Sequence, residues 1–341
     1  MHELRLMIAA VLIMPTGVFA EPVFLQHRVN DPINLLVAIP AISSPNTGGF
    51  EVQAGISHVN VFAGGTTSGS SGDEFLVLDG AVTQLELRGQ IALRSCFSAA
   101  FDTRVISHSG GLFDNVIETW HEIFGLPDAG RDESPPNQQI FVFSNTGNFD
   151  PSVAEFSASQ TQLTSSPTAF GDVWLSLQRP THCNPASGSK PGSGHVRVGV
   201  KLPVGSTSGW ASGGQGAVFA DWHSLPNRIG RRGRVTTTVG ASYSTELDER
   251  FEALTPRRLI AYGSVVFDYS WTPIFQSVVQ LDFRSPTFDS ELPELGFGGQ
   301  IHVGLRAAVA KQHRFELSIS EDIIVDSAPD VGIRFAYTYT P

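Results

Sequence analysis

The last residues of the chain alternate in a way that few folds can use. In the run VGIRFAYTY, Val331–Tyr339, apolar or aromatic residues take every odd position and small or polar residues every even one. Because successive side chains of a strand point to opposite faces, this run predicts a strand with an aromatic face and a polar face. The preceding stretch, Arg314–Ser320, sets apolar side chains opposite charges of both signs. That combination is typical of a barrel with lipid outside and water inside.

A sheet in hydrocarbon must close, because an open edge leaves backbone groups without hydrogen-bond partners. We therefore predict an all-β fold, a closed antiparallel transmembrane β-barrel of about 12 strands. Many of the expected strands exceed the length of about 5–6 residues that is usual in soluble proteins. The first is expected over Glu51–Phe62, with a flexible loop over 63–73 after it.

The connections between the expected strands alternate between tight and long. Those near Arg94, Trp271 and Lys311 are tight, whereas those beginning near residues 63, 109, 205, 247, 285 and 322 are longer. Bacterial barrels have short periplasmic turns and long extracellular loops. The alternation therefore predicts that both ends of the chain lie in the periplasm.

The first 20 residues have the pattern of a secretory signal peptide. Arg5 supplies a positive charge, Leu6–Met14 is apolar, and Val18-Phe19-Ala20 precedes the expected cleavage site. Residues 21–50 contain several prolines and are predicted to form an extended periplasmic leader that could enter the lumen. Residues 51–341 form the barrel. The net charge of −11 argues against a nucleic-acid partner.

One stretch of the expected barrel has helical periodicity, within a long extracellular excursion over residues 109–160. Its apolar stripe consists of Phe113, Val116, Ile117, Trp120 and Phe124. We predict a short amphipathic helix that packs at the mouth of the barrel and narrows the pore. Its polar face is acidic, which disfavours the alternative of a helix lying on the lipopolysaccharide surface.

Charged residues on the polar faces of the strands are the candidates for a pore lining. They are Glu86, Arg88, Asp102, Arg104, Asp172, Arg197, Lys201, Arg258, Asp268, Asp282, Arg284, Arg306, Arg314, Glu316 and Arg334. They can be interpreted as a lining that selects polar solutes or as ion pairs that fill the lumen and hold the barrel together. About twelve strands enclose only a modest interior, so the residues alone leave both interpretations open.

Five segments also resemble a family of Gram-negative outer-membrane β-barrels defined only as a domain of unknown function. The marker is SHSGGLFDNVIETWHEIFGLPDAGRD, Ser107–Asp132, which is similar to the family's GG-helix-FGLP-GR segment. GDVWLSL, VKLPVG, LDFRSP and LSISED follow in the family's order over most of the mature chain. The resemblance implies the barrel and its location in the outer membrane. The chain departs from the usual ending of such barrels, because Thr340 and Pro341 follow the last aromatic residue, Tyr339.

Enzymatic patterns are sparse. His121-Glu122 begins a metalloprotease HExxH pattern, but position 125 is Gly, so the second ligand is missing. A lipid or lipopolysaccharide hydrolase at the outer rim would need groups such as His58, Ser107, His108 and Ser109. We predict neither a cofactor nor a metal, and we keep the hydrolase as an alternative.

The two cysteines, Cys96 and Cys183, are both expected at the periplasmic rim, where an oxidising environment allows a disulfide. The expected partners are outer-membrane lipid, lipopolysaccharide and the barrel-assembly machinery. Passive transport of small polar solutes is the predicted function. The alternatives are the hydrolase and a closed structural or interaction barrel.

Overall fold

The structure is a computed structural model of the chain. It describes residues 25, 32–42, 49–69, 72–93, 96–111, 119, 123, 137–150, 152, 157–181, 194–324 and 331–341. No helix within these ranges is long and apolar enough to cross a membrane.

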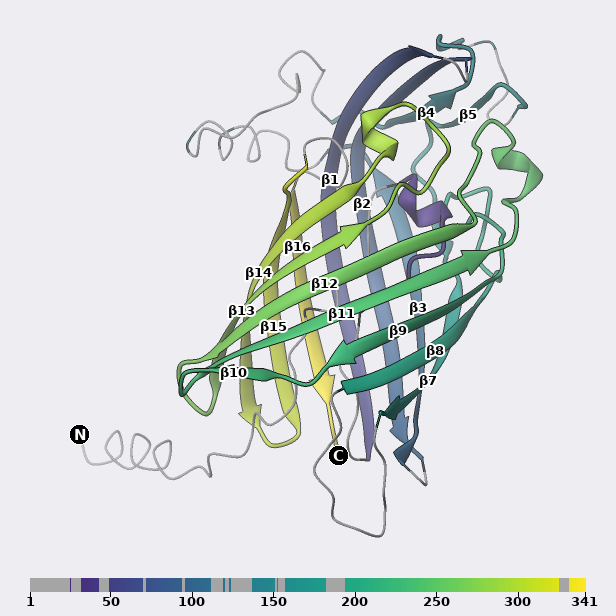
Figure 1. The fold of residues 1–341 in the computed structure, drawn as a ribbon. Coiled ribbons are helices and arrows are strands. Elements are labelled where there is room, and N and C mark those ends of the chain that lie inside the picture. The colour runs from purple at the N-terminus through teal and green to yellow at the C-terminus, as the bar shows by residue number, and fades with distance from the viewer. Residues whose placement is uncertain are drawn as a thin grey trace.

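Twelve of the described strands form a closed antiparallel barrel (Figure 1). They are β1 (Phe50–Gly69), β2 (Gly72–Ala92), β3 (Ser98–Ser109), β7 (Val173–Pro180), β8 (Gly194–Leu202), β9 (Ala217–Ser224), β11 (Gly233–Ser244), β12 (Leu259–Ser270), β13 (Phe275–Arg284), β14 (Gly298–Ala310), β15 (His313–Asp322) and β16 (Val331–Tyr339). The last strand closes the barrel by pairing with the first, from Val52 opposite Tyr339 to Asn60 opposite Val331. The predicted fold class and strand number are confirmed.

In the structure, the alternating side chains of each strand face the outer surface and the lumen in turn. Ile333 and Phe335 on β16 are exposed on the outer surface, whereas Arg334 between them is buried. The same holds on β15, where Leu317 is exposed and Glu316 is buried. An exposed apolar surface that runs around the barrel is what a lipid environment requires.

The β1–β2 hairpin is longer than expected, because its ladder continues to Gly69 opposite Gly72. The expectation of a flexible loop over 63–73 is therefore wrong. Transmembrane strands need about 9–11 residues, so the 20 residues of β1 and 21 of β2 extend beyond the barrel wall. In Figure 1 the two strands rise above the rest at the end that carries the long loops.

Short elements join this extension. β4 (Ile140–Ser144) pairs with the upper part of β2 and with β5 (Gln160–Leu163), and β6 (Thr168–Phe170) pairs with β3. β10 (Asn227–Ile229) pairs with β11 at the opposite end. Three 3-10 turns complete the described elements: η1 (Asn34–Leu36), η4 (Glu249–Phe251) and η5 (Pro293–Leu295).

An apolar core, which we call the cap core, fills the loop end of the barrel. It combines inward side chains of the β1–β2 extension with side chains from the loops and from the leader. Its large members are Ile33, Leu35, Leu36, Val37, Val59, Val61, Leu76, Leu78, Val82, Ile106, Phe141, Phe143, Leu163, Trp210, Phe251, Leu254, Ile260, Phe288, Leu292 and Leu295. Trp210 sits at its centre, with its ring 6.4 Å from Phe141 and 5.9 Å from Phe251.

The described leader residues lie inside the barrel. The Leu25 backbone exchanges two hydrogen bonds with Gln280 of β13, at 2.9 and 3.0 Å. Nearer the loop end, the Thr287 hydroxyl donates to Asn34 Oδ1 at 2.9 Å. On the way back, the Ala41 carbonyl accepts from Arg197 of β8 at 2.8 Å. Because β13 and β8 belong to different sides of the barrel, these contacts place the leader in the lumen.

Candidate functional site: the barrel lumen

A chain of ion pairs crosses the inner wall along five neighbouring strands, β2, β1, β16, β15 and β14. Arg334 is its centre, with Nη2 at 3.0 Å from Glu86 and Nη1 at 2.5 Å from Glu316. Glu316 is also held by Arg306 at 2.8 Å, and Gln53 accepts a hydrogen bond from Arg334 at 3.3 Å. Each charge has an opposite charge within contact distance, so this wall is electrically compensated.

A second cluster lies on β8, β9, β11 and β12. Asp221 accepts from Arg197 at 2.5 Å, from the Tyr262 hydroxyl at 2.9 Å, and lies 2.8 Å from His223 Nε2. The other ring nitrogen of His223 lies 2.9 Å from the Thr238 hydroxyl. All five side chains are buried. An Asp–His–Thr arrangement enclosed in this way, with its carboxylate bound by an arginine, fixes four strands together.

Further inward pairs complete the lining. Lys201 binds Asp172 at 2.7 Å, Arg234 binds Asp268 at 2.7 Å, and His302 lies 3.0 Å from Asp282. Arg314 pairs with Glu51, and Arg284 donates to the Gly296 carbonyl at 3.0 Å. The candidates on the inward side of their strands are Glu86, Arg88, Asp102, Arg104, Arg197, Lys201, Asp268, Asp282, Arg284, Arg306, Arg314, Glu316 and Arg334. Asp172 lies just before β7 and is buried. The role of these residues in a pore stays a prediction.

Arg258 is the exception among the candidates. It precedes β12, which begins at Leu259, so the alternation of the strand does not extend to it. Arg258 is exposed at the loop end and pairs with Glu246. It lies outside the lumen, and its assignment to the lining is corrected.

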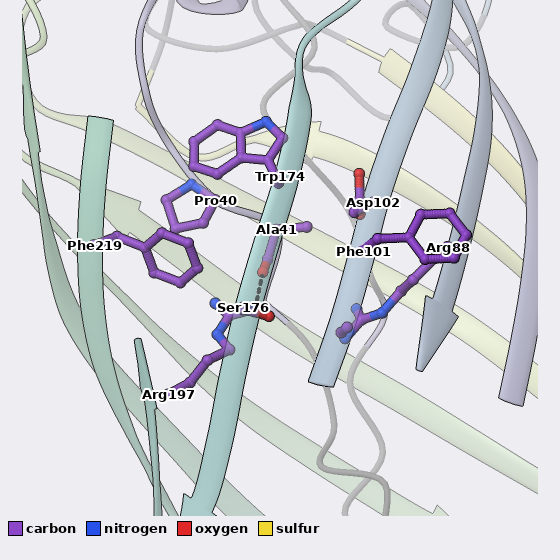
Figure 2. Close-up of a pocket in the computed structure, with 10 residues that line it drawn as sticks. Pro40, Ala41, Arg88, Phe101, Asp102, Trp174, Ser176, Arg197 and Phe219 are labelled. Carbon is purple, nitrogen blue, oxygen red and sulfur yellow. Dashed lines mark hydrogen bonds between the residues drawn. The ribbon is translucent and has the colours of Figure 1, made fainter. Parts of the chain in front are cut away.

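The leader and the wall meet at a small cavity of about 20 Å³ (Figure 2). Pro40 and Ala41 line it from the leader, and Trp174 of β7, Phe219 of β9 and Arg197 line it from the wall. Trp174 and Phe219 meet edge to face, with ring centroids 5.8 Å apart. The Arg197 guanidinium lies 4.9 Å from the Phe219 ring centroid.

The outer-rim candidates do not assemble a catalytic group. Ser107 and His108 are consecutive in β3, so their side chains point to opposite faces. His58 lies on β1, and β2 separates it from Ser107 by about 4.8 Å per strand step. His58 bonds to Thr83 and Ser107 to Thr168, hydroxyl groups in both cases. Ser109 ends β3.

Several predicted residues lie outside the described part of the chain. They are the helix stripe Phe113, Val116, Ile117, Trp120 and Phe124, and also His121, Glu122 and Cys183. Cys96 is disulfide-bonded; its pairing with Cys183 stays a prediction. Within the described ranges, no group of three or more His, Cys, Asp or Glu side chains could hold a metal ion.

Sequence reasoning identified Arg197, which binds the leader, but missed the other residues around it. Asp221 and His223 lie in AVFADWHS, Ala217–Ser224, where Val218, Ala220 and Trp222 take the other face. That alternation was sufficient to place both residues inward. The contacts that Gln280, Thr287 and Trp174 make with the leader join residues distant in sequence, and nothing in the local pattern indicates them.

Two solved outer-membrane proteins are similar to this chain. The crystal structure of the COG4313 outer membrane channel from Pseudomonas putida F1 has a TM-score of 0.52 at 10% identity, covering 87% of this chain and 97% of that chain. The P. putida toluene transporter TodX has a TM-score of 0.40 at 9% identity, covering 87% and 91%. No curated protein matches the sequence. The first likeness supports the fold, an outer-membrane type of barrel.

The sequence match extends over nearly the whole chain after residue 24. The family model described as "Protein of unknown function (DUF3187)" matches residues 25–340, from the buried Leu25 of the leader to the residue after β16. The match thus includes both the barrel and the leader inside it, and the chain belongs to the DUF3187 family.

Proposed function

We propose that this protein is an outer-membrane channel for the passive diffusion of small polar solutes, held closed by its own leader. The inward faces of its strands carry charged and polar groups along most of their length, which is the lining that a water-filled path requires. The P. putida F1 structure with a similar fold is described as an outer membrane channel. The observation that carries the proposal is the leader in the lumen, attached to the polar wall by a few hydrogen bonds.

The leader divides into two parts by the strength of its contacts. The anchor segment, residues 33–37, contributes Ile33, Leu35, Leu36 and Val37 to the cap core. Burying a large aliphatic side chain is worth about 1.5–3 kcal/mol, so these four contribute roughly 6–12 kcal/mol. Release of the whole leader is therefore too rare to support transport.

The gate segment, residues 38–42, is held less firmly. Two of its side chains are alanines, and its hydrogen bond to the wall runs from Arg197 to the Ala41 carbonyl. That charged hydrogen bond is worth about 1.5–3 kcal/mol, and the burial of Ile42 adds about as much. Ile39 is partly buried against the cap core and adds about 1 kcal/mol. Moving this segment alone costs roughly 4–7 kcal/mol, which corresponds to an open fraction of roughly 10⁻³ to 10⁻⁵. We infer brief openings around a leader that stays anchored.

A closed structural barrel is the second candidate, and the compensated ion pairs of Arg334, Glu86, Glu316 and Arg306 favour it. Pairs of this kind would hold the wall together whether or not solutes pass. No such observation favours a hydrolase. His58 and Ser107 lie on strands that β2 separates, and each bonds to a threonine hydroxyl group instead of to the other.

The proposed setting is the outer membrane of a Gram-negative cell, reached after removal of residues 1–20. Lipid and lipopolysaccharide would contact the exposed apolar belt, and the assembly machinery would insert the barrel. The turn end would face the periplasm and the cap core the exterior. This orientation follows from the rule that periplasmic turns are short.

Conductance of the purified full chain in planar bilayers tests the proposal. We expect resolved single-channel steps with a low open probability, because the gate segment is closed most of the time. A bilayer that stays silent after verified insertion would favour the closed structural barrel.

A further inference from the structure

The cavity beside the gate segment has the composition of a binding site that the leader already occupies. At about 20 Å³ it has room for only one or two water molecules while Pro40 and Ala41 are in place. Displacing these two residues would add their volume to the cavity. The site is therefore best characterised by the groups that the leader now presents to the wall.

Those groups are a small ring and a neutral oxygen. In Figure 2 the Pro40 ring lies between Trp174 and Phe219, two wall residues that line the same cavity. The neighbouring Ala41 carbonyl accepts a hydrogen bond from Arg197 Nη1 at 2.8 Å. Aromatic walls bind flat or cyclic apolar groups, and the guanidinium fixes the position of an acceptor oxygen.

The charges around the cavity decide between a neutral and an anionic ligand. Arg197 directs Nε and Nη2 to Asp221, at 3.1 and 2.5 Å, and Nη1 to the Ala41 carbonyl, at 2.8 Å. Arg88 and Asp102 also line the cavity and are directly opposite each other on β2 and β3. The two guanidinium groups are thus matched in number by two carboxylates, those of Asp221 and Asp102. A neutral acceptor keeps this balance, whereas a carboxylate ligand would add an uncompensated negative charge.

We propose that the lumen contains a binding site for small cyclic or aromatic molecules that carry a neutral carbonyl group, such as aromatic amides and ketones. The ring takes the place of Pro40 between Trp174 and Phe219. The carbonyl oxygen takes the place of the Ala41 oxygen on Arg197. The proposal rests on the proposed function, because it names the class of solute for which the channel is built.

Binding can be measured without any transport, by ¹⁹F NMR on the full chain in detergent micelles. The probe is 4-fluorobenzamide, and 4-fluorobenzoate has the same ring with a negative charge. We expect concentration-dependent broadening for the amide and an affinity at least about tenfold lower for the benzoate, the effect of one uncompensated charge.

Variants locate the site. Arg197→Lys keeps a charge beside Asp221 but cannot hold both Asp221 and the ligand, and Phe219→Leu removes one aromatic wall. Each is expected to weaken amide binding about tenfold or more. Ser264→Ala, an inward residue of β12 outside the cavity lining, is the matched control and should bind as the parent does. Resistance to SDS at room temperature verifies that each variant is folded.

Equal broadening in all variants would mean partition into the micelle only and would overturn the proposal, as would a benzoate that binds as tightly as the amide. The binding site and the channel can be rejected independently of each other. A bilayer that conducts normally, with no amide binding, rejects this site and leaves the channel intact. Specific amide binding to a protein that never conducts rejects the channel and leaves the site.

Discussion

Replacing Arg334 by methionine removes the centre of the ion-pair chain while keeping the volume of the side chain close to that of the parent. Arg334 is 1% exposed. Its loss leaves Glu86 without its arginine, whereas Glu316 keeps Arg306 at 2.8 Å. Breaking a buried pair on one side costs about 3–5 kcal/mol. Because the Glu86 side chain is 13% exposed, we expect the lower end, about 3 kcal/mol.

The assay is unfolding in guanidinium chloride of protein folded in detergent micelles, followed by the loss of the heat-modifiable form on gels. The double variant Arg334→Met with Glu86→Gln should recover most of the lost stability, because no unpaired charge remains. Arg258→Met is the control: its exposed pair with Glu246 contributes about 0–1 kcal/mol. A loss below about 1 kcal/mol for Arg334→Met would contradict a desolvated ion pair and indicate that water in the lumen solvates these charges.

Three further outcomes are expected. Leu36→Ala should cost about 2–5 kcal/mol in the cap core but leave the brief openings in bilayer recordings unchanged, because it weakens the anchor segment and not the gate segment; the lipid-facing Leu87→Ala should also leave them unchanged. A disulfide between Asn34→Cys and Thr287→Cys, whose parent side chains touch at 2.9 Å, should leave brief openings intact, because it fixes only the anchor; abolished currents would contradict a local gate. Reduction of the parent should lower its stability by about 2–4 kcal/mol if Cys96 pairs with Cys183, as mass spectrometry of the intact peptide pair can establish.

The barrel could be predicted from the sequence because its constraint is local and repeated. Side chains alternate between lipid and lumen along every strand. The pattern alone therefore predicts that Phe335 faces outward and Arg334 faces the lumen. Closure follows from the cost of an open edge in hydrocarbon. The alternation does not predict which way a residue outside a strand faces. Arg258 lies just before β12 and is exposed at the loop end, although we predicted it in the lining.

The lumen contents could be predicted only in outline. The prolines of the leader exclude a regular strand, but they do not say that Leu25 meets Gln280 or that Ala41 meets Arg197. The β1–β2 extension was missed for a related reason. Its Gly and Ser residues have the composition of a loop, yet pairing of the two strands as far as Gly69 and Gly72 outweighs that local preference.

The accessibility of residue 41 to a thiol reagent shows whether the gate segment lies in the permeation path. Ala41→Cys places a thiol on the gate segment, where the side chain is 5% exposed and only an opening can admit a reagent. In planar bilayers, a charged methanethiosulfonate reagent should change the current irreversibly, at a rate proportional to the open probability. Leu87→Cys on the lipid face should not respond. Currents that continue unchanged while mass spectrometry shows residue 41 unmodified would contradict a gate in the permeation path.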